Sequence, residues 1–268
     1  MPTPTISTDE VIIILERIRA RHPLVHCLTN HVVKNFTANV LLALGAAPAM
    51  VEHAEEAAEF AAMADALLVN VGTLDEPQIT AIRRAIPSAN QAHKPWVLDP
   101  VAVGPLTVRT KFAHEIVALR PTLIRGNASE IIALAGQTGR GRGVDSGDAA
   151  EAALTAARHL AKQSGGAVLV TGPIDYATNG SEIVACANGL PLMTRVTGVG
   201  CAQGAVAAAC AAVADSPLGA AVAAATLMGV AGDLAAHISI RPGSFATALL
   251  DALDQLDAAT LRREAKLS

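Results

Sequence analysis

The segment RVTGVGCAQGAV, which begins at Arg195, places a cysteine directly behind two glycines. Glycine lets a backbone turn tightly and approach a ligand closely. The alanine-rich residues that follow, 205–214, favour a helix, so Cys201 is expected at or near a helix N-terminus. Unpaired N–H groups and the helix dipole attract anions at such a terminus. The turn that contains Gly198 and Gly200 is therefore a candidate anion hole.

Three interpretations of the Cys201 thiol follow from the residues alone. It is a small buried hydrophobic group beside Cys210, a covalent nucleophile whose pKa is lowered by the helix N-terminus, or a proton acceptor next to the anion hole. Covalent catalysis by cysteine usually needs a positioned histidine base, and the eight histidines show no pattern that supplies one. The residues leave all three interpretations open.

Two acidic residues are candidates for metal chemistry. Asp99 ends an apolar run just before Pro100, where a carboxylate can hold a hydrated Mg²⁺ that bridges phosphates. The alternative is that it caps the following loop. Glu130 stands at the start of an expected helix, where negative charge is favourable in any case. It is either an ordinary first-turn glutamate or part of a metal and phosphate site.

Arg125 and Thr171 are candidates for binding phosphate. Arg125 interrupts an otherwise apolar strand end, and its planar fork suits phosphate oxygens bidentately. The alternative is an internal ion pair with Glu130 or Asp99. Thr171 follows an apolar strand, where it meets a nucleotide phosphate or simply ends the strand.

Apolar runs alternate with helical patterns along most of the chain. The expected strands are 23–28, 47–51, 66–71, 96–99, 122–125 and 167–171, followed by a hairpin in 175–192. The expected helices are 7–21, 32–44, 55–64, 77–93 with a break near Pro87, 130–135, 149–163, 201–214, 217–237 and 243–257. A glycine-rich loop is expected at 136–147.

This alternation predicts an α/β fold with a largely parallel sheet covered on both faces, in a single domain spanning 1–268. Ligands bind such sheets beyond the carboxyl ends of the strands. Together with the turn 198–201, the residues expected to converge at that edge are Thr29, Asn30, Met50, Gly72, Thr73, Asp99, Arg125, Gly126, Asn127, Thr171 and Gly172.

The composition excludes several classes of protein. Of the 268 residues, 51% are apolar and 16% charged, the net charge is −4, and the aromatic residues are four Phe, one Trp and one Tyr. A nucleic-acid-binding protein would need a basic face or stacking platforms. The four cysteines lack metal-finger spacing, which favours reduced thiols in a cytoplasmic protein. The uncharged runs 196–214 and 216–232 are rich in alanine and glycine, which favours core helices over membrane spans.

The motifs together resemble the hydroxyethylthiazole kinase family. The likeness covers roughly residues 22–257 in the same order, and no single motif would carry it. The segments concerned are CLTN (27–30), VKNFTAN (33–39), LLALGA (41–46), PAM (48–50), NVGTL (70–74), VLDPV (97–101), IRGNASEI (124–131), GVDS (143–146), TG (171–172), VTGVGC (196–201) and GSF (243–245).

The resemblance implies a ribokinase-like three-layer α/β/α fold and a homotrimer with active sites between subunits. It also implies ATP-dependent, Mg²⁺-assisted phosphorylation of 4-methyl-5-(2-hydroxyethyl)thiazole in thiamine salvage. The residues that it assigns are Met50, Gly198 and Asn30 for the thiazole; Arg125, Thr171 and Asn127 for ATP; Asp99 and Glu130 for the metal; and Cys201, with Gly198 and Gly200, for catalysis. Cys201 takes the place where sugar kinases of this superfamily carry an aspartate base.

One position departs from the family pattern. The usual turn reads Gly-Thr-Gly-Cys, and here Val199 replaces the threonine, so a backbone donor is kept while a hydroxyl is lost. The alternatives to a thiazole kinase are a related kinase for hydroxymethylpyrimidine or a sugar, an ATP-dependent repair dehydratase, and a non-catalytic binding protein. The loss of the threonine hydroxyl is the one feature that favours the last of these.

Overall fold

The computed structural model describes residues 5–136 and 146–268, with side chains described from 151 onward in the second range. Its centre is one eight-stranded sheet in the order β2-β1-β3-β4-β5-β6-β7-β8. Only β7 runs against the others, because β6 and β8 both pair with it in the antiparallel sense. The strands are β1 (Leu24–Leu28), β2 (Ala47–Ala49), β3 (Ala66–Asn70), β4 (Trp96–Asp99), β5 (Leu123–Asn127), β6 (Ala167–Thr171), β7 (Asp175–Thr178) and β8 (Ile183–Cys186).

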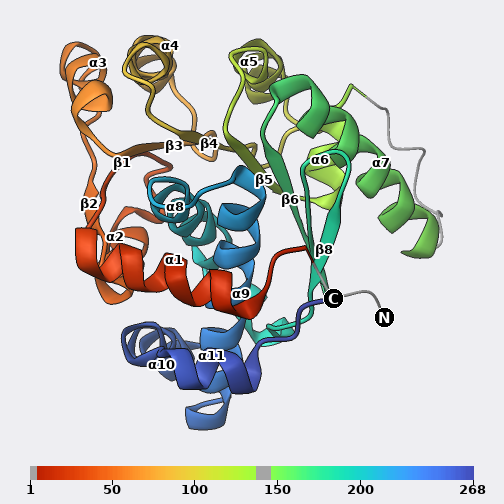
Figure 1. Ribbon diagram of the computed structural model, residues 1–268. Helices are drawn as coiled ribbons and strands as arrows, with labels where there is room; N and C mark the ends of the chain where they lie inside the picture. The colour runs from red at the N-terminus through yellow and green to blue at the C-terminus, as the bar shows by residue number, and fades with distance from the viewer. Residues whose placement is uncertain (1–4, 137–145) are drawn as a thin grey trace.

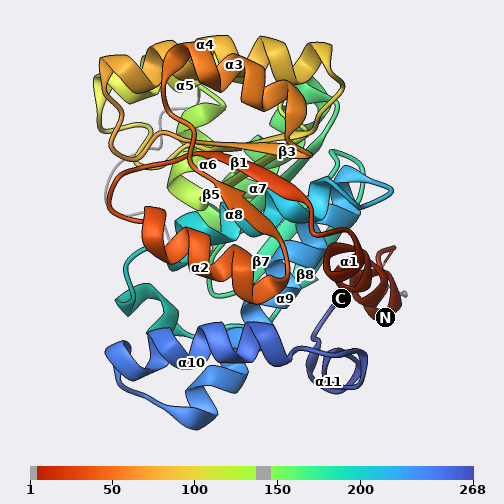
Figure 2. The same cartoon turned by 90° about the vertical axis from the view of Figure 1, so that its left-hand side faces the viewer.

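Helices cover both faces of this sheet, as Figures 1 and 2 show. The first face carries α3 (Ala54–Met63), α4 (Glu76–Gln91), α5 (Thr107–Val117), α6 (Ala128–Leu134) and α7 (Ser146–Ser164). The second face carries α1 (Thr8–Arg21), α2 (Lys34–Leu44), α8 (Val199–Ala211) and α9 (Pro217–Ile238), with α10 (Pro242–Gln255) and α11 (Ala258–Glu264) packed outside α9. A short 3₁₀ helix, Pro191–Arg195, leads into α8.

The alternation of side chains along each strand divides the core into two halves. In β3, Leu67 and Val69 pack with the helices of the first face, whereas Leu68 packs with those of the second face. All five residues of β3 are buried. This burial on both sides is typical of parallel strands and explains why their sequences read as continuous apolar runs. The predicted three-layer α/β fold is therefore confirmed.

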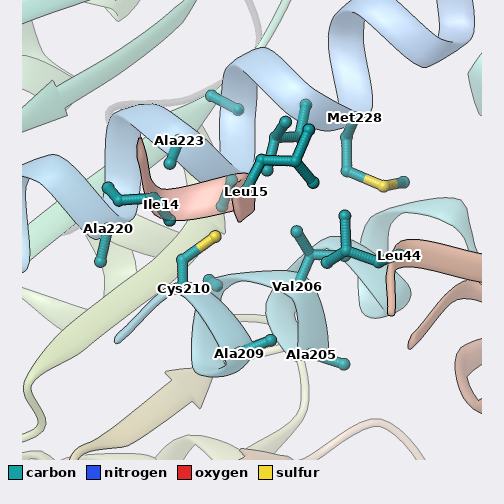
Figure 3. Packing of buried hydrophobic residues seen from close by; sticks show 14 of the residues in the cluster. Ile14, Leu15, Leu44, Ala205, Val206, Ala209, Cys210, Ala220, Ala223 and Met228 are labelled. Atoms are coloured by element: carbon teal, nitrogen blue, oxygen red, sulfur yellow. The ribbon is translucent and has the colours of Figure 1, made fainter. Parts of the chain in front are cut away.

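Small side chains let α8 and α9 pack closely beneath the sheet. Figure 3 shows Ala205, Val206, Ala209 and Cys210 of α8 facing Ala220 and Ala223 of α9, with side chains of α1 and α2 closing the same cluster. Burial raises the pKa of the Cys210 thiol, so this thiol stays protonated. Cys210 is a core residue.

Helix α9 is the one helix in the described part of the chain that is long and apolar enough to cross a membrane. However, 89% of its most apolar 18-residue window is buried inside the protein. Packing in the core therefore accounts for its composition, as the sequence predicted.

Three differences separate the observed elements from the expected ones. α4 continues through Pro87 without a break; Pro87 is on the exposed face, where water can satisfy the carbonyl that proline leaves unpaired. α5 was not predicted, although its buried residues Phe112, Ala113 and Ile116 lie at helical spacing. α11, capped by Asp257, was also missed. The predicted loop at 136–147 falls mostly outside the described residues, as does most of GVDS (143–146).

Candidate active site

The parallel strands bring their following residues to one edge of the sheet, where α8 begins. Asp99 ends β4, and Asn70 ends β3 beside it in register. Hydrogen bonds and an ion pair connect these two residues to Asn30, Arg125 and Cys201. Asn30, Asp99, Arg125 and Cys201, which the sequence analysis expected to converge, therefore lie together at this edge of the sheet.

Helix α8 starts with free backbone donors. Its N-cap, Gly198, has a φ of 97° and makes no side-chain cap hydrogen bond. A side chain at this position would be strained, and its Cβ would lie 3.1 Å from Cγ1 of Val33. The N–H of Val199 donates to the carbonyl of Val196 at 3.5 Å. The first N–H groups of a helix have no intrahelical partner, so Gly200 and Cys201 present donors to an anion at this end of the dipole. Val199 itself is buried, and its side chain packs into the core.

Asp99 is completely buried at the centre of the site. Its Oδ2 accepts a hydrogen bond from Nδ2 of Asn70 at 2.7 Å, while its buried Oδ1 has no hydrogen-bond partner in the described structure. Nη1 of Arg125 lies 3.8 Å from that oxygen. The pKa of Asp99 is raised to about 7, mainly by burial; Arg125 and the hydrogen bond from Asn70 lower it, and the charge of Glu130 raises it.

A row of amide side chains links Asp99 to the thiol. Oδ1 of Asn70 accepts from Nδ2 of Asn30 at 3.0 Å, and the same amide group of Asn30 donates to Sγ of Cys201 at 3.4 Å. The N–H of Gly72 also donates to Oδ1 of Asn70. Sequence reasoning did not single out Asn70 as a site residue. Its signal is the same as that of Asp99, a polar residue at the end of a wholly apolar strand.

The Cys201 thiol is not a pre-formed thiolate. Burial raises its pKa, the nearby Asp99 carboxylate raises it further, and hydrogen bonds from Asn70 and Asn30 and the charge of Arg125 only partly oppose this. This direction is opposite to the lowering that the helix N-terminus alone would give. The covalent-nucleophile interpretation therefore lacks the activated thiolate that it needs.

Glu130 and Asn127 form a capping box at the start of α6. Oδ1 of Asn127 accepts from the N–H of Glu130 at 3.0 Å, and Oε2 of Glu130 accepts from the N–H of Asn127 at 2.9 Å. Oε1 of Glu130 accepts from the N–H of Ala102. The carboxylate is thus held firmly next to Asp99, with one lone pair of each oxygen still free.

A pocket of ≈ 670 Å³ opens beside the start of α8. Among its lining residues are Arg125, Asn127, Thr171, Gly198 and Gly200. This volume lies in the range of small-molecule and cofactor sites. A larger hollow of ≈ 820 Å³, lined by residues such as Glu10 and Lys162, lies near the amino end of β6, away from these groups.

The substrate residues predicted by resemblance are only partly brought together. Asn30 contacts Cys201, and Gly198 starts α8 at the same place. Met50 follows β2, the outermost strand on that side, and is half-buried against the core. Met50, Asn30 and Cys201 are all absent from the residues that line the pocket. Sequence reasoning also missed Gln203 and Asp175, two pocket residues that contact Arg125 or its neighbours.

Comparisons with known proteins point to a single family. A family model described as the hydroxyethylthiazole kinase family matches residues 15–259. The hydroxyethylthiazole kinase of Klebsiella pneumoniae (strain 342) is 59% identical over 89% of this chain and 92% of its own, and that of Granulibacter bethesdensis is 53% identical over 97% and 94%.

Solved structures give the same result. The hydroxyethylthiazole kinase protein of Pyrococcus horikoshii OT3 has a TM-score of 0.90 at 38% identity, covering 97% of this chain and 98% of its own. The pyridoxal kinase of Staphylococcus aureus, in complex with AMP-PCP and pyridoxal, has a TM-score of 0.59 at 17% identity, over 79% and 87%. At 17% identity, the similarity to pyridoxal kinase shows a shared fold and nothing more.

Proposed function

The chain belongs to the hydroxyethylthiazole kinase family, and from that premise we propose that its carboxyl-edge residues transfer the γ-phosphoryl group of ATP to the hydroxyl group of 4-methyl-5-(2-hydroxyethyl)thiazole. It is a phosphotransferase, and its place is in thiamine salvage. The observation that carries the proposal is the meeting of Cys201, Arg125 and Asp99 at the start of α8, beside a pocket of ≈ 670 Å³.

ATP occupies that pocket, with its phosphates toward α8. Phosphoryl transfer has a loose transition state, so catalysis consists mainly of positioning and of stabilising charge on the transferred oxygens. The N–H groups of Gly200 and Cys201, in the turn that Gly198 begins, act as an oxyanion-type hole. Arg125 supplies the positive charge, while Thr171 and Asn127 border the nucleotide.

Asp99 and Glu130 would hold Mg²⁺ in this proposal. The buried Oδ1 of Asp99, which lacks a hydrogen-bond partner in the described structure, fits a hard cation that prefers oxygen ligands. Glu130 keeps its position through two backbone hydrogen bonds. When bound, the ion would neutralise phosphate charge and orient the triphosphate.

Cys201 accepts the proton of the attacking hydroxyl in its thiolate form, after its own thiol proton has left to solvent. Burial raises the pKa of this thiol, so the thiolate is a minor species, but a loose transition state needs only a weak contribution from a base. Asn30 holds the thiol through its amide and borders the thiazole together with Gly198. Because Met50 follows the edge strand β2, a site completed between subunits of a homotrimer would explain why Met50 is not among the pocket residues. The enzyme would work as a single-domain chain in the cytoplasm.

Replacement of Cys201 by alanine is expected to lower kcat about 10²-fold, the lower end of the range for a general base. The variant should keep measurable activity and unchanged ATP affinity, because the anion hole is made of backbone groups. Steady-state kinetics with MgATP tests this. Cys210→Ala is the matched control: it removes a core thiol of the same helix, so Tm should fall while kcat stays near wild type. A folded, ATP-binding Cys201→Ala with no activity would contradict the proposal.

The function itself is tested by ADP release with MgATP, with and without the thiazole, together with mass detection of the product. We expect a thiazole-dependent signal and a product heavier by one phosphate. Release of inorganic phosphate with a dehydrated product, or a signal only with hydroxymethylpyrimidine or a sugar, would overturn it. Tight thiazole binding without ADP release would instead support the non-catalytic protein that Val199 favours.

A further inference from the structure

Arg125 is held from one side by a buried amide, Gln203. Nε of Arg125 donates to Oε1 of Gln203 at 3.0 Å, and Nε2 of Gln203 donates to Oδ2 of Asp175 at 3.1 Å. Gln203 is 7% exposed and lines the pocket. The orientation of the amide is fixed by its neighbours, because a guanidinium only donates hydrogen bonds and an ionised carboxylate only accepts them.

The far end of this row is anchored to the pocket wall. Oδ1 of Asp175 accepts from the N–H of Gly172 at 3.0 Å, and Gly172 follows Thr171 directly. The row Arg125–Gln203–Asp175–Gly172 therefore joins β5, α8 and the turn between β6 and β7. Three elements that border one pocket are held in a fixed relation by hydrogen bonds.

The bond to Gln203 determines which edge of the guanidinium is free. Gln203 takes the Nε edge, Nη1 lies 3.8 Å from Oδ1 of Asp99, and Nη2 lies against Gly200, where a Cβ would be only 3.1 Å away. The Nη edge thus lies along the first turn of α8. Without the amide between them, Arg125 and Asp175 would attract each other directly, and the fork would turn away from α8.

We propose that Gln203, anchored by Asp175, is a positioning residue that keeps the Nη edge of Arg125 directed at the transferred phosphate. This inference rests on the proposed kinase function. A misplacement of about 1 Å in a reacting group can cost about 10²-fold in rate. We therefore expect Gln203→Leu, which removes both hydrogen bonds at similar volume, to lower kcat/KM for ATP at least about tenfold, with KM for the thiazole nearly unchanged.

A reciprocal exchange tests the geometry. Gln203→Glu places a second carboxylate against Asp175, and Asp175→Asn places two amide donors against each other, so each single variant should lose activity. In Gln203→Glu/Asp175→Asn the amide of residue 175 donates to the carboxylate of residue 203, which still accepts from Arg125. The double variant should recover to within about threefold of wild type, a coupling that independent sites do not show.

Thr226→Val is the control, since Thr226 is a buried polar residue of α9 that does not line the pocket. Its hydroxyl donates to the carbonyl of Val222 in the same helix and lies 3.9 Å from Sγ of Cys186. It should change Tm without changing KM or kcat. Wild-type kinetics in Gln203→Leu, or a double variant no better than the single ones, would overturn the inference. Calorimetric titration with MgATP separates the two proposals: a wild-type enzyme inactive on thiazole refutes the function, whereas weaker MgATP binding by Gln203→Leu still supports the positioning role.

Discussion

Arg125→Ala should abolish nearly all phosphoryl transfer, with a loss in kcat of about 10³–10⁴-fold, comparable to removing a positively charged group from other phosphoryl-transfer sites. The guanidinium lies between Asp99 and Gln203 and is only 12% exposed, so water does not replace its charge. Its loss removes a cation from the place where negative charge develops. Single-turnover kinetics at saturating MgATP measures this effect on the chemical step.

The loss in Arg125→Ala should exceed that in Cys201→Ala by at least about tenfold, since charge stabilisation contributes more than a base in a loose transition state. Arg83→Ala serves as the matched control. Arg83 pairs bidentately with Glu115 at the surface, at 2.7 and 2.8 Å, so its removal should leave kcat unchanged. Equal losses in kcat for Arg125→Ala and Cys201→Ala would instead favour proton transfer as the rate-limiting step.

The fold was largely predictable because buried parallel strands leave a clear signal. The runs 66–69 and 96–98 are wholly apolar, and the structure places β3 and β4 there, ending at Asn70 and Asp99. Two features that the sequence analysis misjudged, α5 and the course of the chain at Pro87, have only weak or local sequence patterns. α5 mixes polar and apolar residues around one buried stripe, and the tolerance of Pro87 depends on its position on the exposed side of α4.

From the sequence, only those site residues could be predicted that stand near the expected end of a strand. Asp99 ends β4 and Asn30 follows β1, and the parallel sheet brings them to one edge. Arg125 was expected at a strand end, but it lies inside β5, two residues before that strand ends. Gln203 gave no such signal, because it is a single polar residue in an alanine-rich helix and its partners lie 78 and 28 positions away in the chain. The raised pKa of Cys201 was also hidden, since burial by distant segments outweighs the local effect of the helix terminus.

Asp99→Asn should lower kcat about 10²–10³-fold, as expected when a charged group of a preorganised phosphate site is removed.

The same change should stabilise the fold at alkaline pH. In the folded protein, burial raises the pKa of Asp99 from 3.8 to about 7. Between these values the folded state binds more protons than the unfolded state, so the free energy of unfolding declines as pH rises. The stabilising contribution is complete below about pH 4 and is lost as pH rises through about 7.

At pH 8.5, without ATP or Mg²⁺, wild-type Asp99 is ionised and buried, while asparagine carries no charge. We expect Asp99→Asn to be more stable by on the order of 1–3 kcal/mol at pH 8.5, and the difference should largely vanish at pH 5. Denaturant unfolding at the two pH values measures this, with exposed Glu56→Gln as the control for removing a carboxylate. A difference independent of pH would mean that Asp99 stays charged throughout. The expected gain in stability alongside the loss of activity would show that the enzyme retains this buried carboxylate for catalysis at a cost to folding.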